Sequence, residues 1–140
     1  MRVFLDSNFL ISAFITEGEV RRLRDRLFKT HEVVVSEEVL SEVSRKLLGK
    51  FNIDKRLIAV NDLYVRAKCR VLPAQGTVPK MTRDPKDDWV LAAAAQASCR
   101  CILTGDDDLT VLGAYKKVAI LRPRDFLAFE AGKFKRRKGK

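Results

Sequence analysis

The sequence contains too little histidine and cysteine for most metal or nucleophile chemistry. Its 140 residues include one histidine, His31, and three cysteines, Cys69, Cys99 and Cys101. A single histidine excludes a histidine-rich metal site, and the three cysteines suggest neither a disulfide framework nor paired zinc ligands. We expect the cysteines to be small buried side chains. No motif indicates that His31 activates a nucleophile, so carboxylates are the expected catalytic groups if the protein is an enzyme.

Long hydrophobic runs are also missing. No stretch approaches the ~18 apolar residues that a membrane helix needs. Asp6 interrupts the apolar N-terminus, which excludes a secretory signal. We therefore expect a soluble, cytoplasmic protein with no membrane partner. The composition, 46% hydrophobic and 33% charged residues, is that of an ordinary globular chain, and its length predicts one domain with a full hydrophobic core.

Positive charge, in contrast, is abundant. Lysine and arginine number 28 against 18 acidic residues, which gives a formal net charge of +10. Much of this charge gathers in the C-terminal KFKRRKGK, which we expect to be disordered and to bind polyanions. Nucleic acid is the partner that such a charge favours, although a tail that only improves solubility is the alternative. The candidate RNA-binding side chains are Lys133, Lys135, Arg136, Arg137 and Lys138.

Short apolar runs alternate with helical patterns along the chain. Strands are predicted at RVFL, EVVVS, CRVLP, CILT and VAIL. Helices are predicted over residues 20–28, 36–51, 54–68, 84–97 and 122–131. Ser36 and Asp84 are suitable N-caps, and Pro85 suits a first helical position. Because strands that alternate with helices need crossover connections, the pattern predicts an α/β fold with a mainly parallel sheet covered on both faces.

The segment LTGDDDL places three aspartates directly after an apolar strand. In a parallel sheet function lies at the carboxyl ends of the strands, and other acids can reach the same edge. The acids that can meet there are Asp6, Glu42, Asp87, Asp88 and Asp106. Clustered carboxylates repel one another unless a cation is present, and oxygen ligands suit Mg²⁺ or Mn²⁺. The sequence therefore predicts an acidic metal site to which a basic surface delivers a polyanion such as RNA.

Each acid also has a simpler structural explanation. Asp6 can cap a helix that contains Asn8, and Glu42 can pair with Lys46 one turn later. The remaining acids can serve as capping or turn residues, namely Asp84, Asp87, Asp107 and Asp108. The metal site is favoured because the acids come from four separate segments that reach one edge of the sheet.

Four motifs, FLDSNFLISA, SEEVLSEV, DDWVLAAA and TGDDDL, resemble in order and separation the PIN-domain ribonucleases. The resemblance is strongest to the VapC-like toxins of prokaryotic toxin–antitoxin pairs. It extends to about Phe129, which implies a PIN-like nuclease domain over residues 1–130 and a basic tail over 131–140. It also implies a three-layer α/β/α sandwich, one or two Mg²⁺ or Mn²⁺ ions, and cleavage of single-stranded RNA by metal-activated water. A homodimer and an antitoxin that blocks the site are further implications.

The resemblance assigns roles to individual residues. The implied catalytic groups and metal ligands are Asp6, Glu42, Asp88 and Asp106. Asp108 is implied as an additional ligand, and Asn8 and Thr104 as supporting residues. The choice of Asp88 over Asp87 depends on the register of the family motif, because both are followed by apolar residues three and four positions later.

Two other functions fit part of the pattern. One is an RNA-binding, ribosome-associated or RNA-processing PIN module with little or no turnover, although the presence of all four acids argues against it. The other is a phosphatase of the haloacid dehalogenase type, which also begins with an aspartate after its first strand. That chemistry needs a second aspartate two residues later, and Asn8 occupies the position here.

Overall fold

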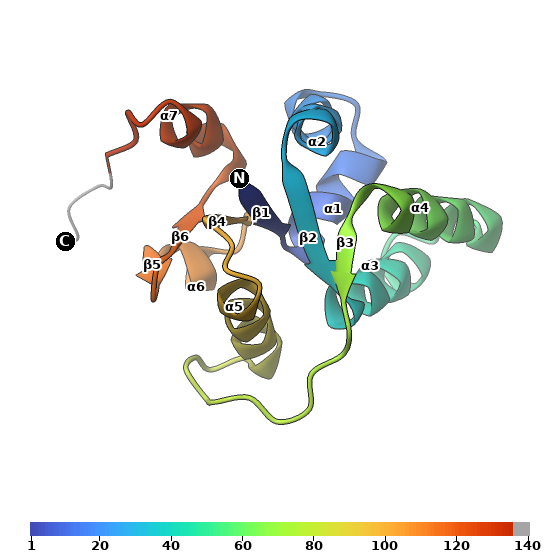
Figure 1. Cartoon of the computed structure of the whole chain (residues 1–140). Coiled ribbons are helices and arrows are strands. Elements are labelled where there is room, and N and C mark those ends of the chain that lie inside the picture. The colour runs from blue at the N-terminus through green and yellow to red at the C-terminus, as the bar shows by residue number, and fades with distance from the viewer. Residues whose placement is uncertain (136–140) are drawn as a thin grey trace.

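A mostly parallel sheet forms the centre of the protein (Figure 1). The structure is a computed structural model that describes residues 1–135. Within these residues the sheet has six strands in the order β3-β2-β1-β4-β6-β5. The strands are β1 (Arg2–Leu5), β2 (Glu32–Ser36), β3 (Arg70–Leu72), β4 (Cys101–Leu103), β5 (Ala114–Tyr115) and β6 (Val118–Leu121). Every pairing is parallel except that of β5 with β6.

Helices cover both faces of the sheet. They are α1 (Ser7–Ile15), α2 (Glu19–Thr30), α3 (Glu37–Gly49), α4 (Lys55–Lys68), α5 (Pro85–Gln96), α6 (Asp107–Thr110) and α7 (Phe126–Glu130), which follows the 3₁₀ turn η1 (Pro123–Asp125). Right-handed crossovers place α1–α4 on one face as the chain moves from β1 to β3, and α5 on the other as it returns to β4. Figure 1 shows these two groups on different sides of the strands. The predicted three-layer α/β/α sandwich is confirmed.

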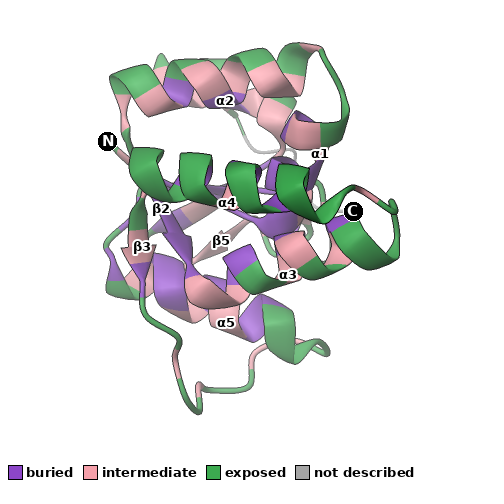
Figure 2. Ribbon diagram, turned by 90° about the vertical axis from the view of Figure 1, so that its right-hand side faces the viewer, coloured by how far each residue is buried: buried purple, intermediate pink, exposed green. Residues whose placement is uncertain are grey.

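The core lies between the sheet and these helices. The three central strands are apolar and almost fully buried, as expected for parallel strands covered on both faces. Figure 2 shows the buried side of α3 turned inward, whereas α4 lies outside it and is mostly exposed. Cys99 and Cys101 are buried as predicted and Cys69 is partly buried. Burial raises the pKa of each of these thiols to about 12, so they stay protonated at neutral pH. Among residues 1–135, no helix has the length and apolar character needed to cross a membrane.

The helix starts follow the capping signals of the sequence. The Ser36 side chain accepts the backbone N–H of Val39 at the start of α3, and Asp84 accepts that of Lys86 at the start of α5. Asp6 caps α1 through the N–H of Ser7. These caps matter for function because they lie near one edge of the sheet, the edge formed by the carboxyl ends of its parallel strands. Asp6 and Ser36 are at the ends of strands, and Asp84 begins a helix that reaches this edge.

The order of the strands marks one place on that edge. From β1 the chain first moves through β2 to β3 and then returns to β4 on the other side of β1. The carboxyl ends of β1 and β4 therefore flank a switch point, where open α/β sheets bind their ligands. Leu5 and Leu103 are paired at these ends, so the residues that follow them come together.

Candidate functional site

Asp6 lies at the switch point, one residue beyond β1. Its carboxylate accepts the backbone N–H of Ser7 at 2.8 Å and the hydroxyl of Thr104 at 2.7 Å. Only 5% of the residue is exposed. Burial raises the pKa of Asp6 to about 6 although these two hydrogen bonds act to lower it, and the nearby charges of Glu42 and Asp106 raise it further. Asp6 is thus both a helix cap and an acid whose ionised form needs a cation nearby.

Thr104 connects Asp6 to the loop after β4. Its hydroxyl oxygen, which donates to Asp6, accepts the backbone N–H of Asp106 at 3.0 Å. Asn8 fixes the same loop, because its Oδ1 accepts the N–H of Gly105 at 3.0 Å. The two residues predicted to support the site therefore lie where they hold the ends of β1 and β4 in register.

Three carboxylates meet between the starts of α5 and α6. One oxygen from each of Asp87, Asp106 and Asp108 lies within 4.8 Å of the other two. A single cation between them can reach all three, and hard oxygen ligands suit Mg²⁺ or Mn²⁺. Burial, followed by the charges of Asp106 and Asp84, raises the pKa of Asp87 to about 7. The group therefore fits a divalent cation, which would offset the repulsion that now opposes ionisation of Asp87.

Asp88 faces a different part of the structure. Its Oδ1 accepts the backbone N–H groups of Met81 and Thr82 at 3.0 and 2.8 Å, and the hydroxyl of Thr82 at 2.9 Å. This carboxylate thus anchors the loop that precedes α5 and is not in the group of three. The expected ligand role of Asp88 stays a prediction, while Asp87, the alternative left open by the sequence, is the residue that lies with Asp106.

Glu42 approaches the site from α3. The hydroxyl of Ser7 donates to its Oε1 at 2.5 Å, and the Nζ atoms of Lys86 and Lys46 lie 3.1 and 3.4 Å from its Oε2. Burial acts to raise the pKa of Glu42, but these partners outweigh burial and the pKa lies below its ordinary value. The pairing with Lys46 expected as the simpler explanation is present, and it coexists with the hydrogen bond from Ser7, the residue that follows Asp6.

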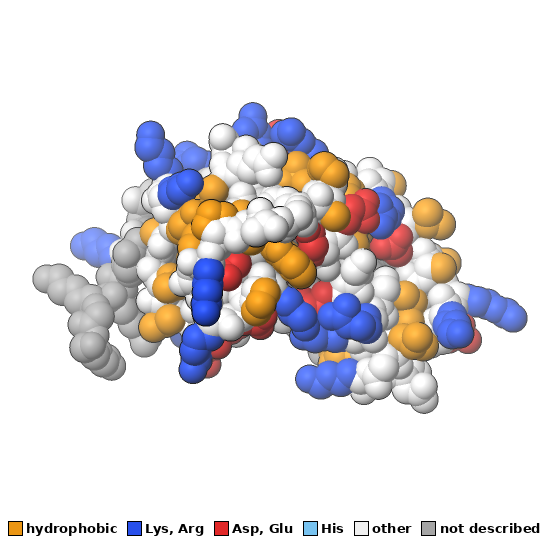
Figure 3. All heavy atoms as spheres, turned by 90° about the horizontal axis from the view of Figure 1, so that it is seen from below, with side chains coloured by type: hydrophobic (Ala, Val, Ile, Leu, Met, Phe, Trp, Pro, Cys, Tyr) orange, Lys and Arg blue, Asp and Glu red, His pale blue; other side chains and the backbone are white. Residues whose placement is uncertain are grey.

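Basic side chains border the acids. Exposed Arg83 lies 3.3 Å from Asp108, and Lys86 pairs with Glu42 from the first turn of α5. Asp107 pairs with Arg122 and is not in the group of three. Figure 3 shows the lower face of the molecule, where acidic side chains lie among lysines and arginines. Arg83 and Lys86 were not among the predicted site residues, although both stand within the motif RDPKDD that marks the start of the helix.

The tail residues are only partly within the described chain. Lys133 and Lys135 are exposed beyond α7. The other predicted RNA-binding residues, Arg136, Arg137 and Lys138, lie outside the described residues. Their RNA-binding role stays a prediction.

A family model described as the PIN domain matches residues 2–108. The match spans more than half of the chain and includes every acid of the site. The chain belongs to the PIN domain family. This confirms the resemblance that the four sequence motifs indicate. None of the curated proteins compared with this PIN domain matches it.

Three solved structures share the fold of this PIN domain. VapBC2 from Rickettsia felis, bound to a DNA fragment from its promoter, is 10% identical, with a TM-score of 0.64 over 87% of this chain and 98% of that chain. VapC20 from Mycobacterium tuberculosis, a sarcin–ricin loop cleaving toxin, is 15% identical, with a TM-score of 0.60 over 84% and 98%. FitAcB from Neisseria gonorrhoeae is 19% identical, with a TM-score of 0.58 over 87% and 98%. At these identities the likenesses show that the fold is shared.

Proposed function

We propose that this PIN domain is a metal-dependent endoribonuclease that cleaves single-stranded RNA and is the toxin of a toxin–antitoxin pair. The observation that carries the proposal is the group formed by Asp87, Asp106 and Asp108 at the switch point of the sheet, next to buried Asp6. Carboxylates held this close repel one another, so the group is costly unless it binds a cation. A cation there, in turn, attracts phosphate.

One Mg²⁺ or Mn²⁺ ion would be held by Asp87, Asp106 and Asp108, with Asp6 available as a further ligand. Bound there, it would supply Lewis-acid stabilisation of a phosphate and a more acidic water. The chain itself supplies the orientation. Thr104 fixes Asp6 by a hydrogen bond of 2.7 Å, and such second-sphere contacts keep ligands in place when a site is loaded.

Glu42 and the basic residues at the border have separate proposed roles. Glu42 is ionised and partly buried beside Ser7, so it can accept a hydrogen bond from a water or hydroxyl at the site. Lys86 pairs with Glu42 and Arg83 lies beside Asp108, so both can contact the phosphates that flank the cleaved bond. Such contacts position a strand without reading its sequence, which leaves specificity to other residues.

The proposal of RNA as substrate rests on charge and on likeness. The positive charge favours a polyanion, and one solved structure with this fold is of a toxin that cleaves the sarcin–ricin loop. The proposal of an antitoxin rests on likeness to the VapBC2 and FitAcB structures. Exposed apolar side chains on α4, at Leu57, Val60 and Leu63, are available for a protein partner, an antitoxin or a second copy of the chain.

We also propose the division into a nuclease domain and a basic tail. Helix α7 ends at Glu130, in agreement with a domain boundary near that residue. Phe134 packs on Phe129 with the ring centroids 6.4 Å apart. This contact ties the first residues of the proposed tail to the domain.

Cleavage of single-stranded RNA in the presence and absence of chelator tests the function. With Mn²⁺ the protein should cut the RNA, and EDTA should stop it. Asp106→Asn should slow cleavage by about 100-fold or more, the scale of removing one strong electrostatic contact to the transition state. Asparagine remains a good helix cap, so α6 should still form.

The matched control is Asp107→Asn. It removes the same charge from the neighbouring position, where the side chain pairs with Arg122 and not with the acidic group. Its cleavage rate should stay within a few-fold of that of the unmodified protein. RNA that is bound but never cut under any metal condition would refute the enzyme and favour an RNA-binding module.

A further inference from the structure

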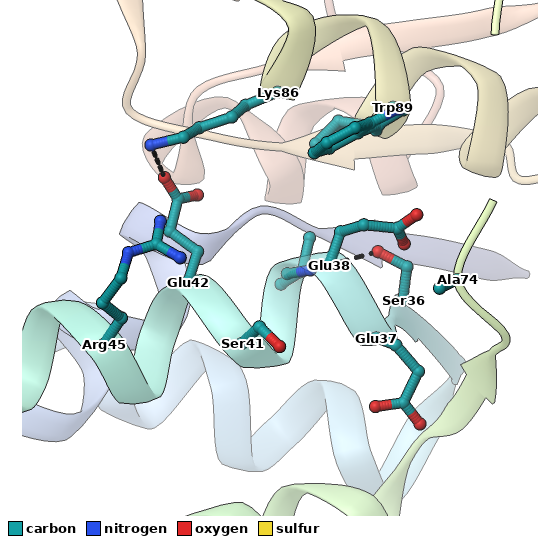
Figure 4. A pocket seen from close by; sticks show the side chains of 11 residues that line it. Ser36, Glu37, Glu38, Ser41, Glu42, Arg45, Ala74, Lys86 and Trp89 are labelled. Carbon is teal, nitrogen blue, oxygen red and sulfur yellow. Dashed lines mark hydrogen bonds and ion pairs between the residues drawn. The ribbon is translucent and has the colours of Figure 1, made fainter. Parts of the chain in front are cut away.

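A cavity of about 240 Å³ opens between α3 and α5, beside the acidic site (Figure 4). Glu42 and Lys86 belong to both places, because they line the cavity and form the ion pair that borders the acids. The volume is below the 300–1,000 Å³ typical of sites for drug-sized ligands. The space therefore suits a single flat ring system that adjoins the acids, and not a longer stretch of polymer.

One wall of the cavity is an aromatic ring. Trp89 projects from α5, and Figure 4 shows its ring facing Glu38 of α3 across the cavity. The residue is partly exposed, although it follows two buried aspartates. In the described part of the chain it stacks on no other aromatic ring. Flat aromatic side chains with a free face are the usual platforms for nucleic acid bases in single strands.

The opposite wall offers a carboxylate with an unused oxygen. The Oε2 of Glu38 accepts the backbone N–H of Gln75 at 2.6 Å. Its Oε1 is buried, and no residue among 1–135 donates a hydrogen bond to it. Buried polar atoms are nearly always paired, since a carboxylate oxygen kept from water without a donor is costly. A ligand that brings N–H groups into the cavity would satisfy this atom once rotation of the Glu38 side chain turns it toward the cavity.

Positive charge lies on the side of the cavity nearest the acids. Lys86 pairs with Glu42 there, and Arg45 lines the same side without an ion-pair partner among residues 1–135. Figure 4 shows the Arg45 side chain directed toward Glu42. The cavity thus offers a stacking surface and a hydrogen-bond acceptor for a base. On the side nearest the acids it offers positive charge for the phosphate of the same nucleotide.

We propose that this cavity binds one base of the RNA, next to the cleaved phosphate, and that it prefers guanine. The base stacks on Trp89, and the Glu38 carboxylate accepts hydrogen bonds from guanine N1–H and from the 2-amino group. Arg45 and Lys86 contact the adjoining phosphate. The inference rests on the proposed function for the identity of the ligand as RNA, and it adds a sequence preference that the acids themselves cannot provide.

The preference for guanine follows from the chemistry of a carboxylate, which accepts hydrogen bonds and donates none when ionised. Guanine presents two adjacent donors on its Watson–Crick edge. Adenine and cytosine present one amino group beside an acceptor nitrogen, and uracil presents one N–H between two carbonyl groups. In each of these three bases an acceptor would face the carboxylate and repel it.

Fluorescence gives a direct test, because Trp89 is the only tryptophan in the chain. The probes are five RNA pentamers, UUXUU with X as guanosine, inosine, adenosine, cytidine or uridine, titrated in EDTA so that nothing is cleaved. The guanosine pentamer should quench tryptophan emission at the lowest concentration. Inosine lacks only the 2-amino group, so its pentamer should bind on the order of tenfold more weakly, within the range lost with one good base contact.

Two variants separate the carboxylate from general charge. Glu38→Gln should bind the guanosine and inosine pentamers equally, because its amide no longer presents two acceptor oxygens. Glu37→Gln is the matched control. Glu37 also lines the cavity, but its two oxygens accept from Arg66 at 2.8 and 2.9 Å. This variant loses the same charge and should keep the preference for guanosine.

Trp89→Ala tests the stacking surface by anisotropy of a labelled guanosine pentamer. Binding should weaken by about 5- to 150-fold, the range measured for loss of one stacked base, and Trp89→Phe should recover much of it. Equal quenching by all five pentamers, or an unchanged preference in Glu38→Gln, would overturn the subsite. The binding titrations contain EDTA and so do not depend on a bound metal. A preference for guanosine in these titrations, without cleavage of RNA in the presence of Mn²⁺, would refute the nuclease and leave the subsite standing.

Discussion

The carboxylates of Asp87 and Asp88 leave the first turn of α5 in different directions. Asp87 lies with Asp106 and Asp108, whereas Asp88 accepts three hydrogen bonds from Met81 and Thr82. Successive residues of a helix are about 100° apart around its axis, so only one of two neighbouring acids can face the cluster. The ionised side chain of Asp87 therefore destabilises the metal-free protein, whereas that of Asp88 stabilises it.

Asp87→Asn should stabilise the metal-free protein above neutral pH, and Asp88→Asn should destabilise it. The first change removes a buried acid whose ionisation is opposed by burial and by Asp106. The second weakens contacts to three donors and should cost about 1–3 kcal/mol. Urea unfolding at pH 8 in EDTA measures both effects. Calorimetric titration with Mn²⁺ completes the test, because Asp87→Asn should lose most of the binding heat. Loss of metal binding in Asp88→Asn alone would assign the ligand to Asp88.

The stability of the metal-free protein should fall as the pH rises from about 5 to 8, above the range in which carboxylates with lowered pKa values, such as Glu42, titrate. Burial raises the pKa of Asp6 to about 6, and burial with neighbouring charges raises that of Asp87 to about 7, both from 3.8. The folded state therefore binds more protons than the unfolded state between these values, and stability declines with pH across that window. The loss should be on the order of several kcal/mol, since both pKa values lie well above 3.8 and one pKa unit corresponds to about 1.4 kcal/mol.

Thermal melts in EDTA at pH 5 and pH 8 measure this decline. Asp87→Asn should flatten the decline because it removes one of the two titrating groups. A melting temperature that rises from pH 5 to pH 8 would contradict the raised pKa values.

Mn²⁺ should raise the melting temperature by binding only the folded state. At a concentration one hundred times its Kd it adds about 2.7 kcal/mol, which for a domain of this size corresponds to roughly 10 °C. The effect should be larger at pH 8 than at pH 5, because protons no longer compete for Asp6 and Asp87. Asp106→Asn should abolish the increase, and Asp107→Asn should retain it. An equal shift in both variants would place the ion elsewhere.

The sequence predicts most of the fold because its strands are short, continuous apolar runs. RVFL, EVVVS and VAIL agree with β1, β2 and β6 at every residue. Helix α1 was anticipated only as a helix that Asp6 could cap, because its residues are apolar on nearly every side and show no clear 3.6-residue period. Strand β5 could not be predicted from a hairpin motif. The turn between β5 and β6 contains Lys116 at a positive φ of 53°, where glycine or asparagine would mark a hairpin in the sequence.

The site was predictable at the level of segments but not of individual side chains. The helix that begins at Pro85 is apolar along most of its length, so the pattern of residues does not fix its rotation about its axis. This is why the pattern of residues alone leaves the choice between Asp87 and Asp88 open. The contact between Trp89 and the cavity beside Glu38 depends on how α3 and α5 pack, and no local motif records it.

Removal of residues 135–140 should weaken RNA binding without abolishing cleavage at saturating RNA. The cut leaves Phe134 in contact with Phe129, so the packing of α7 is preserved. Five basic residues are lost. Each phosphate contact on a single strand contributes about −0.7 to the slope of log K against log salt, so the slope should become flatter by up to about 3.5.

Binding is measured across a salt series with Asp106→Asn in both proteins to keep the RNA intact. A full-length variant with these five side chains changed to glutamine should match the truncation, because charge and not chain length is the cause. Equal slopes with and without the tail would show that it does not contact RNA.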